Sequence, residues 1–335
     1  MGAVTESAVN PITGVPYNPP PPQKPPAPKL TLVERRRIEM ADHIFDIGAD
    51  GGNIAYISSI AAQCGLPHTD PGHLCGFYKR ENGNTALTIV RGTLKNPYTG
   101  NIEIMGYPYG PKPRLMFIDV CTQAILTQSP HVDLGRSMSD FMRRLGISPN
   151  GGLRGQMSAM KEQLMRFIAC HMQLYISDEK RYSMVHASPP IKQFNLWLPN
   201  RPHEVGRWEG MVTLGDEFFA CIMDGCVPMR QEAIRALQNS SMDIDTYTWL
   251  NSRLHRVTKP VLLTRHQLHA QFGPDYAVER FFWRDFTKRC LPRVKMVYPD
   301  AKFEVTPEGM KLFASRPSIS KTLSASRRKL LENKT

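Results

Sequence analysis

The stretch that decides the fold is VLLTRHQLHAQFGPDYAVERFFWRDFTKRC, residues 261–290. It starts as a strand-like apolar run, and residues 264–267 (TRHQ) form a capping box that opens a short helix. Residues 273–275 (GPD) predict a turn, and a longer helix is expected over residues 276–290. A hairpin is predicted around residues 306–309 (TPEG). Strand, short helix, turn, long helix and hairpin is an order typical of a winged helix.

The same order of elements occurs earlier in the chain. Its predicted parts are a strand at residues 132–134, a short helix capped by Ser137, a turn at 148–152, a helix from Leu153 with one apolar stripe, and strands at 168–176 and 191–198. No sequence identity links the two copies, so the repeat is one of element order alone. We therefore predict an α+β fold with two winged-helix domains in tandem.

The ends of the chain differ in composition from its middle. Nine prolines lie between Pro11 and Pro28, a density that excludes a helix or a strand and predicts an extended, disordered tail. The predicted organisation is a Pro-rich tail at residues 1–40, an N-terminal winged-helix-like domain at 41–205, a C-terminal DNA-binding winged helix at 206–317 and a disordered basic tail at 318–335.

The charge of the chain favours a polyanionic partner. Its formal net charge is +12 with a pI near 9.4, and residues 276–335 hold 14 Lys and Arg against 6 Asp and Glu. No apolar run is long enough to span a membrane, and the first residues do not resemble a signal peptide. Seven scattered cysteines predict reduced thiols in a cytoplasmic protein, and no membrane partner is expected.

The long helix is the predicted reader of double-stranded DNA. Arg280, Arg284 and Lys288 are spaced four apart. They lie on a face opposite an apolar row of Val278, Phe282 and Phe286. Like charges at this spacing cost a few tenths of a kcal/mol per pair unless an anion offsets them. Arginine can bind guanine through two hydrogen bonds, and Tyr276 near the helix start is placed where base edges are reached. A solvated basic surface remains the alternative.

Further DNA contacts are expected from both predicted domains. In the C-terminal domain the candidates are Arg293, Lys302 and Lys311, which lie beyond the long helix and beside the hairpin. In the N-terminal domain the equivalent helix face carries Arg154, Ser158 and Lys161. Because that face also holds Glu162, a role in dimerisation or as a scaffold is the alternative for the N-terminal domain.

Residues 64–75 contain four side chains of the metal-ligating types, Cys64, His68, His73 and Cys75. The single residue between His73 and Cys75 differs from the usual spacing of structural zinc sites. A metal-dependent enzyme built on this cluster is therefore a second alternative function. No phosphate-binding loop, nucleophile elbow or HExxH motif is present, so we expect neither an enzyme nor a cofactor.

Several short motifs together resemble one family. They lie at residues 106–115 (GYPYGPKPRL), 132–146 (VDLGRSMSDFMRRLG), 247–254 (YTWLNSRL), 268–273 (LHAQFG) and 297–301 (VYPDA). In this order they resemble plasmid-encoded RepA replication proteins over roughly residues 85–317. The resemblance implies a plasmid replication initiator that binds repeated origin sites, recruits the host replication initiator and helicase, and acts as a homodimer without covalent catalysis. It also allows autoregulation of its own gene, and a winged-helix transcriptional repressor is the alternative.

Overall fold

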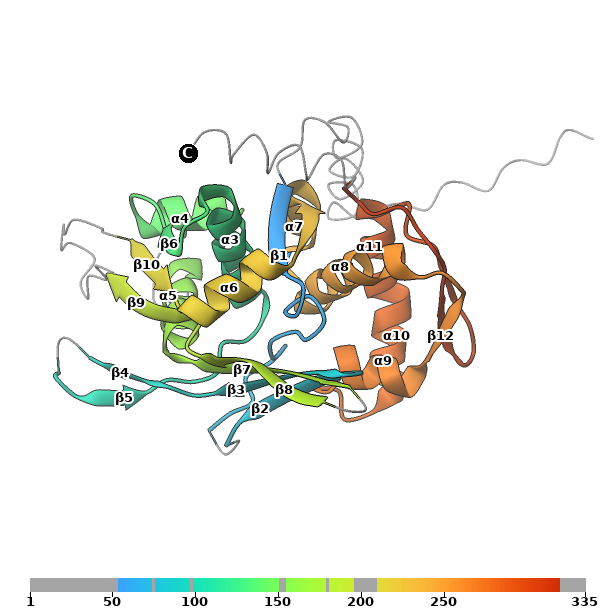
Figure 1. Ribbon diagram of the computed structural model, residues 1–335, viewed down its shortest axis with the longest axis horizontal. Helices are drawn as coiled ribbons and strands as arrows, with labels where there is room; N and C mark the ends of the chain where they lie inside the picture. The colour runs from blue at the N-terminus through green and yellow to red at the C-terminus, as the bar shows by residue number, and fades with distance from the viewer. Residues whose placement is uncertain are drawn as a thin grey trace, which may run out of the picture. The chain divides into compact units, whose positions relative to one another are not determined.

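The computed structural model describes residues 54–73, 76–96, 99–150, 155–178, 181–195 and 210–319. The predicted tail at residues 1–40 and nearly all of the predicted tail at 318–335 lie outside these ranges. The described chain is a mixture of helices and small antiparallel sheets, so the predicted α+β class is confirmed (Figure 1). Among the described residues, no helix is both long and apolar enough to cross a membrane.

The predicted C-terminal elements are all present, and we refer to them as the C-terminal repeat. Helix α8 (Ser241–Arg253) and the short helix η1 (Leu254–Arg256) precede them. The repeat itself consists of β12 (Val261–Thr264), α9 (Arg265–Phe272), α10 (Glu279–Asp285), the π-helix η2 (Phe286–Cys290), α11 (Leu291–Val297), β13 (Phe303–Val305) and β14 (Gly309–Leu312). Its three antiparallel strands are ordered β12-β14-β13.

The N-terminal repeat has the same order of elements and the same order of strands. Helix α3 (Pro111–Thr127) precedes β6 (His131–Asp133), α4 (Met138–Arg144), α5 (Gln156–Ala169), β9 (Ile191–Asn195) and β10 (Met211–Leu214). The sheet order β6-β10-β9 corresponds to β12-β14-β13. Ser137 caps α4 as predicted, because its side chain accepts a hydrogen bond from the Asp140 amide.

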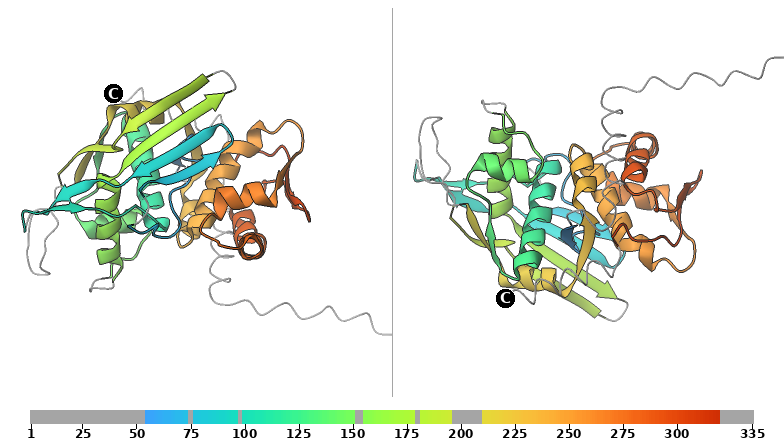
Figure 2. Two further views of the ribbon diagram at one scale, coloured as in Figure 1. Left: turned by 90° about the horizontal axis from the view of Figure 1, so that it is seen from below. Right: turned by 90° about the horizontal axis from the view of Figure 1, so that it is seen from above.

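The hairpin predicted for the N-terminal repeat from residues 168–176 and 191–198 is wrong. The first of these segments forms β7 (His171–Asp178), which pairs with β8 (Arg181–Ser188) and with β3 (Thr85–Val90). Together with β2 (Tyr78–Asn82) they make a separate four-stranded sheet, β2-β3-β7-β8, seen in the left panel of Figure 2. The prediction failed because two strands inserted between α5 and β9 have the same apolar pattern as a wing.

A short hairpin follows β3 in the chain. Residues 85–90 belong to β3 in the four-stranded sheet, and the hairpin itself is β4 (Thr93–Lys95) with β5 (Ile102–Ile104). Helix α6 (Asp216–Asp224) lies on the same face of the four-stranded sheet as α3 and α5 (Figure 1). Apolar side chains between these helices and the sheet form the core of this part of the chain.

One further sheet joins segments that are far apart in the sequence. Strand β1 (Ile54–Ser58) pairs with β11 (Cys226–Arg230), which leads into α7 (Gln231–Leu237). The predicted domain boundary between residues 205 and 206 falls before β10, although β10 pairs with β6 and β9 of the N-terminal repeat. The predicted division of the chain into domains stays a prediction.

A buried ion pair connects the helices that precede the two repeats. Arg114 of α3 donates to both carboxylate oxygens of Asp245 in α8, at 2.7 and 2.8 Å. Its N–H groups also donate to the carbonyls of Leu66, Pro67 and Gly110. Both side chains are nearly inaccessible to solvent, at 4% and 11% exposure. The pair therefore fixes α3 and α8 to each other through charge-assisted hydrogen bonds.

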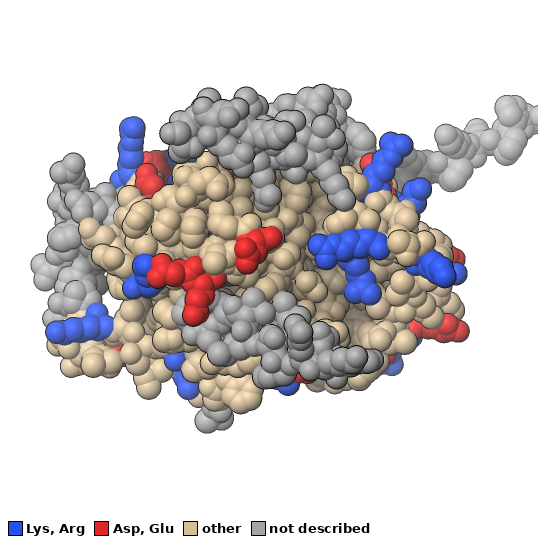
Figure 3. All heavy atoms as spheres, viewed as in Figure 1, with Lys and Arg blue, Asp and Glu red and all other residues tan. Residues whose placement is uncertain are grey.

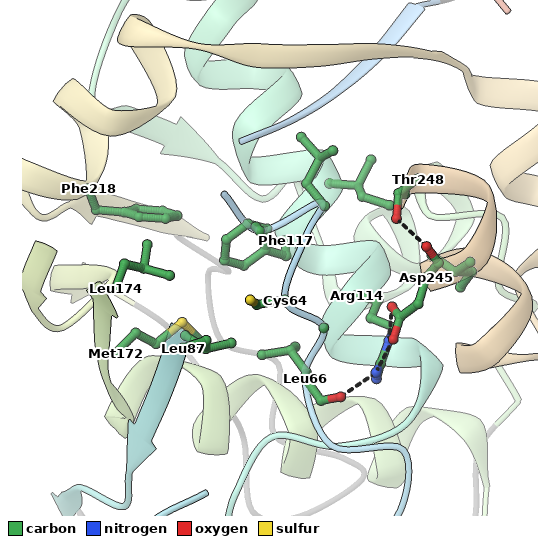
Figure 4. A pocket seen from close by; sticks show the side chains of 15 residues that line it. Cys64, Leu66, Leu87, Arg114, Phe117, Met172, Leu174, Phe218, Asp245 and Thr248 are labelled. Atoms are coloured by element: carbon green, nitrogen blue, oxygen red, sulfur yellow. Dashed lines mark hydrogen bonds and ion pairs between the residues drawn. The ribbon is translucent and has the colours of Figure 1, made fainter. Parts of the chain in front are cut away.

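A small apolar cavity of ≈ 30 Å³ lies beside this pair (Figure 4). Phe117 of α3, Phe218 of α6 and Leu174 of β7 are among its walls, and Arg114 closes one side. The Cys64 thiol lies in its wall and donates to the Thr85 carbonyl, and burial raises its pKa to about 12. Such a thiol is protonated and unreactive near neutral pH. The cavity therefore contains no reactive cysteine, and we regard it as part of the apolar core.

His68 makes the stability of this region depend on pH. Its Nδ1 lies 2.8 Å from Ser241 Oγ, and burial together with the charge of Arg114 lowers its pKa to about 3. The unfolded chain, with an ordinary histidine pKa, therefore binds more protons than the folded chain between about pH 6.5 and 3. The contribution of His68 is present above pH 6.5 and is lost as the pH falls through this window.

We expect His68→Gln to flatten the acid side of the stability profile. Below pH 6.5 the free energy of unfolding of the parent protein should fall with a slope steeper than that of the variant by up to about 1.4 kcal/mol per pH unit. Urea unfolding followed at several pH values measures this slope. His266, whose side chain is 86% exposed, supplies the control His266→Gln. Equal slopes for the parent and His68→Gln would contradict the assignment.

Candidate nucleic-acid interface

The turn between α9 and α10 sets the angle of the long helix. Thr264 and Gln267 form the predicted capping box at the start of α9. After α9, Gly273 lies against the ring of Phe282, and a β-carbon at this position would stand 2.3 Å from the nearest ring carbon. Only glycine allows this approach, so the turn and the first buried phenylalanine of α10 depend on each other.

The long helix is anchored through aromatic side chains. Phe282 and Phe286 are fully buried, and their rings stack at 5.2 Å between centroids. Phe286 also stacks on Phe272 of α9 at 5.6 Å, and Phe272 meets Trp249 of α8 edge-on at 5.3 Å. This row confirms the predicted apolar face at Phe282 and Phe286 but not at Val278, and it attaches the helix to α9 and α8.

The helix differs from the predicted one at its start and in its middle. It begins at Glu279, because Tyr276 lies in the preceding turn and Val278 is extended and 45% exposed. In the middle it widens into a π turn, η2, in which the Leu291 amide donates to the Phe286 carbonyl. Pro292 follows directly and cannot donate to the carbonyl four residues earlier, which accounts for a wider turn at this place.

The opposite side of the helix carries the predicted cations. Arg280, Arg284 and Lys288 are all exposed, and the guanidinium groups of Arg280 and Arg284 lie 5.0 and 5.5 Å from the ring of Phe281. Neither Arg280 nor Lys288 forms an ion pair with the described part of the chain. In the view of Figure 3, Lys and Arg gather over the half of the molecule that holds α8 to α11.

Arg284 has a local partner in Asp285. Its Nε donates to Asp285 Oδ1 at 3.1 Å, while its side chain remains 56% exposed. This hydrogen bond, with the charges of Arg284 and Arg289, lowers the pKa of Asp285. The Tyr276 hydroxyl also donates to Asp285, at 3.4 Å. Asp285 therefore orients Tyr276 and Arg284 at one end of the exposed face without removing Arg284 from solvent.

The other predicted residues of the C-terminal repeat are not part of this face. Arg293 donates to the buried carboxylate of Asp243 at 3.2 Å, and its side chain is 30% exposed. Because a buried carboxylate needs this partner, we leave Arg293 out of the interface. Lys302 is exposed just before β13, at the base of the hairpin. Lys311 is half-buried in β14, opposite Glu304 of β13.

In the N-terminal repeat, helix α5 offers a weaker surface. Ser158 is exposed and Lys161 is half-buried, with a pKa lowered by that burial, while Arg154 lies outside the described residues. The next cation on the helix, Arg166, is bound by Asp70 and Glu162 at 2.8 and 2.6 Å. DNA contact through Arg154, Ser158 and Lys161 stays a prediction.

Two cations beside the interface were missed from the sequence. Arg265 at the start of α9 lies 4.9 Å from the ring of Trp283, and its amide donates to the Glu308 carbonyl at the tip of the hairpin. Arg289, beside Lys288, is exposed and reaches Asp285 at 3.9 Å. A helical wheel places Arg289 away from the basic row and one turn after Asp285, which accounts for the ion pair between these two side chains.

The three described residues of the predicted metal-ligating set each have other partners. Cys64 is buried, His68 contacts Ser241 and Asp245, His73 contacts Arg91, and Cys75 lies outside the described ranges. In the described segments no three His, Cys, Asp or Glu side chains are placed to hold a metal ion. Because Cys75 is not described, the alternative of a metal-dependent enzyme built on this cluster stays a prediction.

The family model described as plasmid encoded RepA protein matches residues 107–262. Over this stretch the chain is similar to RepA proteins, which confirms the predicted resemblance. The RepA-like stretch runs from just before α3 into β12, and it ends before α9 and the long helix. No curated protein shows significant sequence similarity to the chain.

Among solved structures, the chain resembles the crystal structure of selenomethionine derivatives of domains 2 and 3 of RctB. The TM-score is 0.44 at 12% sequence identity, with 70% of this chain and 84% of that chain covered. A likeness this distant carries no argument about function.

Proposed function

We propose that the protein is a plasmid replication initiator that binds double-stranded origin DNA and has no catalytic step of its own. The observation that carries this proposal is the match of residues 107–262 to the RepA family model. The exposed basic face of the long helix supports the same function, because Arg280, Arg284 and Lys288 can bind phosphates and base edges.

The two repeats support a tandem winged-helix arrangement. Each consists of a helix, a strand, two helices and a two-stranded wing, and each sheet has the first strand beside the last. In this proposal α10 with η2 reads the major groove in the C-terminal repeat. The N-terminal repeat docks on an adjacent half-site or on a second copy in a homodimer. Bound copies would recruit the host replication initiator and helicase in the cytoplasm.

A plasmid maintenance assay tests the proposal. A plasmid with no other origin receives the DNA that flanks the gene, and the protein is supplied in trans. We expect the plasmid to be maintained with the parent protein and lost with the Arg280→Ala/Arg284→Ala variant. A protein that binds this DNA and represses its own promoter, but does not maintain the plasmid, would be a transcriptional repressor instead.

A further inference from the structure

A second basic surface lies at the base of the C-terminal wing, away from the recognition face. We name it the wing-base groove. It has a volume of ≈ 690 Å³, and the side chains that define it are Lys259, Lys295, Lys302, Phe303 and Phe313. A second groove of ≈ 380 Å³ adjoins it through Thr258 and Lys259 and is lined by Arg253 and Arg256. The two grooves together present five cations and no carboxylate among their lining residues.

These cations lack acidic partners. Within the described ranges, none of the five forms an ion pair with Asp or Glu, whereas Arg284, Arg289 and Arg293 in α10 to α11 all do. Lys259 and Lys302 are exposed at the rim of the groove. Lys295 donates to the Pro299 carbonyl at 2.8 Å, which fixes its ammonium group beside the groove. Uncompensated cations around a concave surface concentrate positive potential and attract a polyanion.

The groove also offers aromatic surface. Phe303 and Phe313 are partly exposed, and the ammonium group of Lys295 lies 5.7 Å from the ring centroid of Phe303. Phenylalanine rings beside lysines match a nucleotide, because the base can stack on the ring while its phosphate meets the cation. A groove of this volume is of small-ligand size, so it has room for an unpaired nucleotide.

The groove is distant from the surface that would read duplex DNA. Lys302 precedes β13 and Phe313 follows β14, so both lie at the end of the wing opposite its turn at Thr306 and Gly309. Lys295 is in the last turn of α11, about 22 Å along the helix axis from Arg280 at 1.5 Å per residue. A duplex bound at the start of the long helix and at the wing turn leaves the groove open.

We propose that the wing-base groove binds single-stranded DNA. Phosphates contact Lys259, Lys302 and the adjoining Arg256, and at least one base stacks on Phe303 or Phe313. This inference goes beyond the proposed function, on which it rests only for the choice of DNA as the polyanion. One protein would then hold duplex DNA on α10 and an unpaired strand at the wing base.

Fluorescence anisotropy with the full chain and a labelled oligothymidylate of about 20 nucleotides tests the inference. We expect Lys259→Gln/Lys302→Gln to raise Kd about tenfold and to lower the salt slope of binding by about 1.4, since each phosphate contact contributes about 0.7. Lys79→Gln/Lys192→Gln removes the same charge from β2 and β9 and should leave both values unchanged. Phe303→Leu should weaken binding without changing the slope.

The same variants distinguish a failure of the groove proposal from a failure of the proposed duplex-binding role of α10. Arg280→Ala/Arg284→Ala should lose duplex binding and keep single-strand binding. Lys259→Gln/Lys302→Gln, the groove variant, should lose single-strand binding and keep duplex binding. Single-strand binding by the groove variant equal to that of the control variant overturns the inference. Equal loss of duplex and single-strand binding in the groove variant also overturns it, because the groove would then contact the duplex backbone. Circular dichroism melts confirm that each variant is folded.

Discussion

Replacing Arg114 by methionine is expected to lower the free energy of unfolding by roughly 3–5 kcal/mol, because it leaves the carboxylate of Asp245 buried without a partner. Burial by itself raises the pKa of Asp245, and the charge and hydrogen bonds of Arg114 outweigh burial so that the pKa is lowered. Three backbone carbonyls would also lose a donor. Urea denaturation followed by circular dichroism measures the loss.

A matched control separates burial from charge. Arg166 also bonds two carboxylates, but those of Asp70 and Glu162 are 39% and 52% exposed. Water can replace the guanidinium there, so Arg166→Met should cost no more than about 1 kcal/mol. If Arg114→Met and Arg166→Met lowered the free energy of unfolding equally, the buried pair would contribute no more to stability than the exposed one.

The double variant Arg114→Met/Asp245→Leu tests whether the ion pair contributes to stability or to the orientation of α3 and α8. If the cost of Arg114→Met is mainly the uncompensated charge, the double variant should recover most of the lost stability. Gly65 is relevant here, since a β-carbon at that position would stand 2.3 Å from Asp245 Oδ2, and the introduced leucine side chain must fit the same space. Recovered stability with weakened DNA binding would indicate that the pair fixes the orientation of α3 and α8.

The C-terminal repeat could be predicted because its signals are local. The capping box at Thr264, the turn at Gly273 and the alternation of Phe282 and Phe286 with cations each depend on neighbours close in the sequence. The same kind of signal located α4 through Ser137. Local propensity and hydrophobic period were therefore sufficient for the elements and the main anchoring residues of this part of the chain.

Pairing over long distances could not be predicted in the same way. β1 pairs with β11 more than 160 residues away, and β7 leaves the expected wing for a sheet with β3. The pattern of a short apolar run does not specify which strand it pairs with, because alternation with a period of two suits any half-buried sheet. The salt bridge from Arg293 to Asp243 escaped prediction for the same reason, as did the meeting of Arg114 with Asp245.

The basic face of the long helix shows how far a helical wheel predicts the positions of side chains. Up to Asp285 the turn is regular and Arg280 and Arg284 occupy the predicted side. Beyond it the π turn adds one residue before Pro292, which a helical wheel does not predict, although Arg289 still lies one turn after Asp285 and reaches its carboxylate. Pro292 was visible in the sequence, but a proline predicts only that the helix is disturbed there.

Replacing Arg280 and Arg284 together by alanine is expected to weaken specific duplex binding by at least about 30-fold, since each bidentate arginine–base contact contributes about 1–3 kcal/mol. Both side chains are exposed and contact Phe281 and Asp285 at the surface, so the fold should lose little stability. Titration of DNA that flanks the gene, at physiological salt, measures the change in Kd.

Arg91→Ala/Arg143→Ala is the control with the same change of charge, because both arginines lie outside the C-terminal repeat and Arg143 is 62% exposed on α4. It should lower affinity only through the general attraction of a basic protein for DNA, and equally for unrelated sequences. The helix variant should instead lose the difference between its own site and unrelated DNA. Unchanged discrimination in that variant would mean that another element reads the sequence, and the N-terminal helix α5 with Ser158 and Lys161 would then become the surface to test.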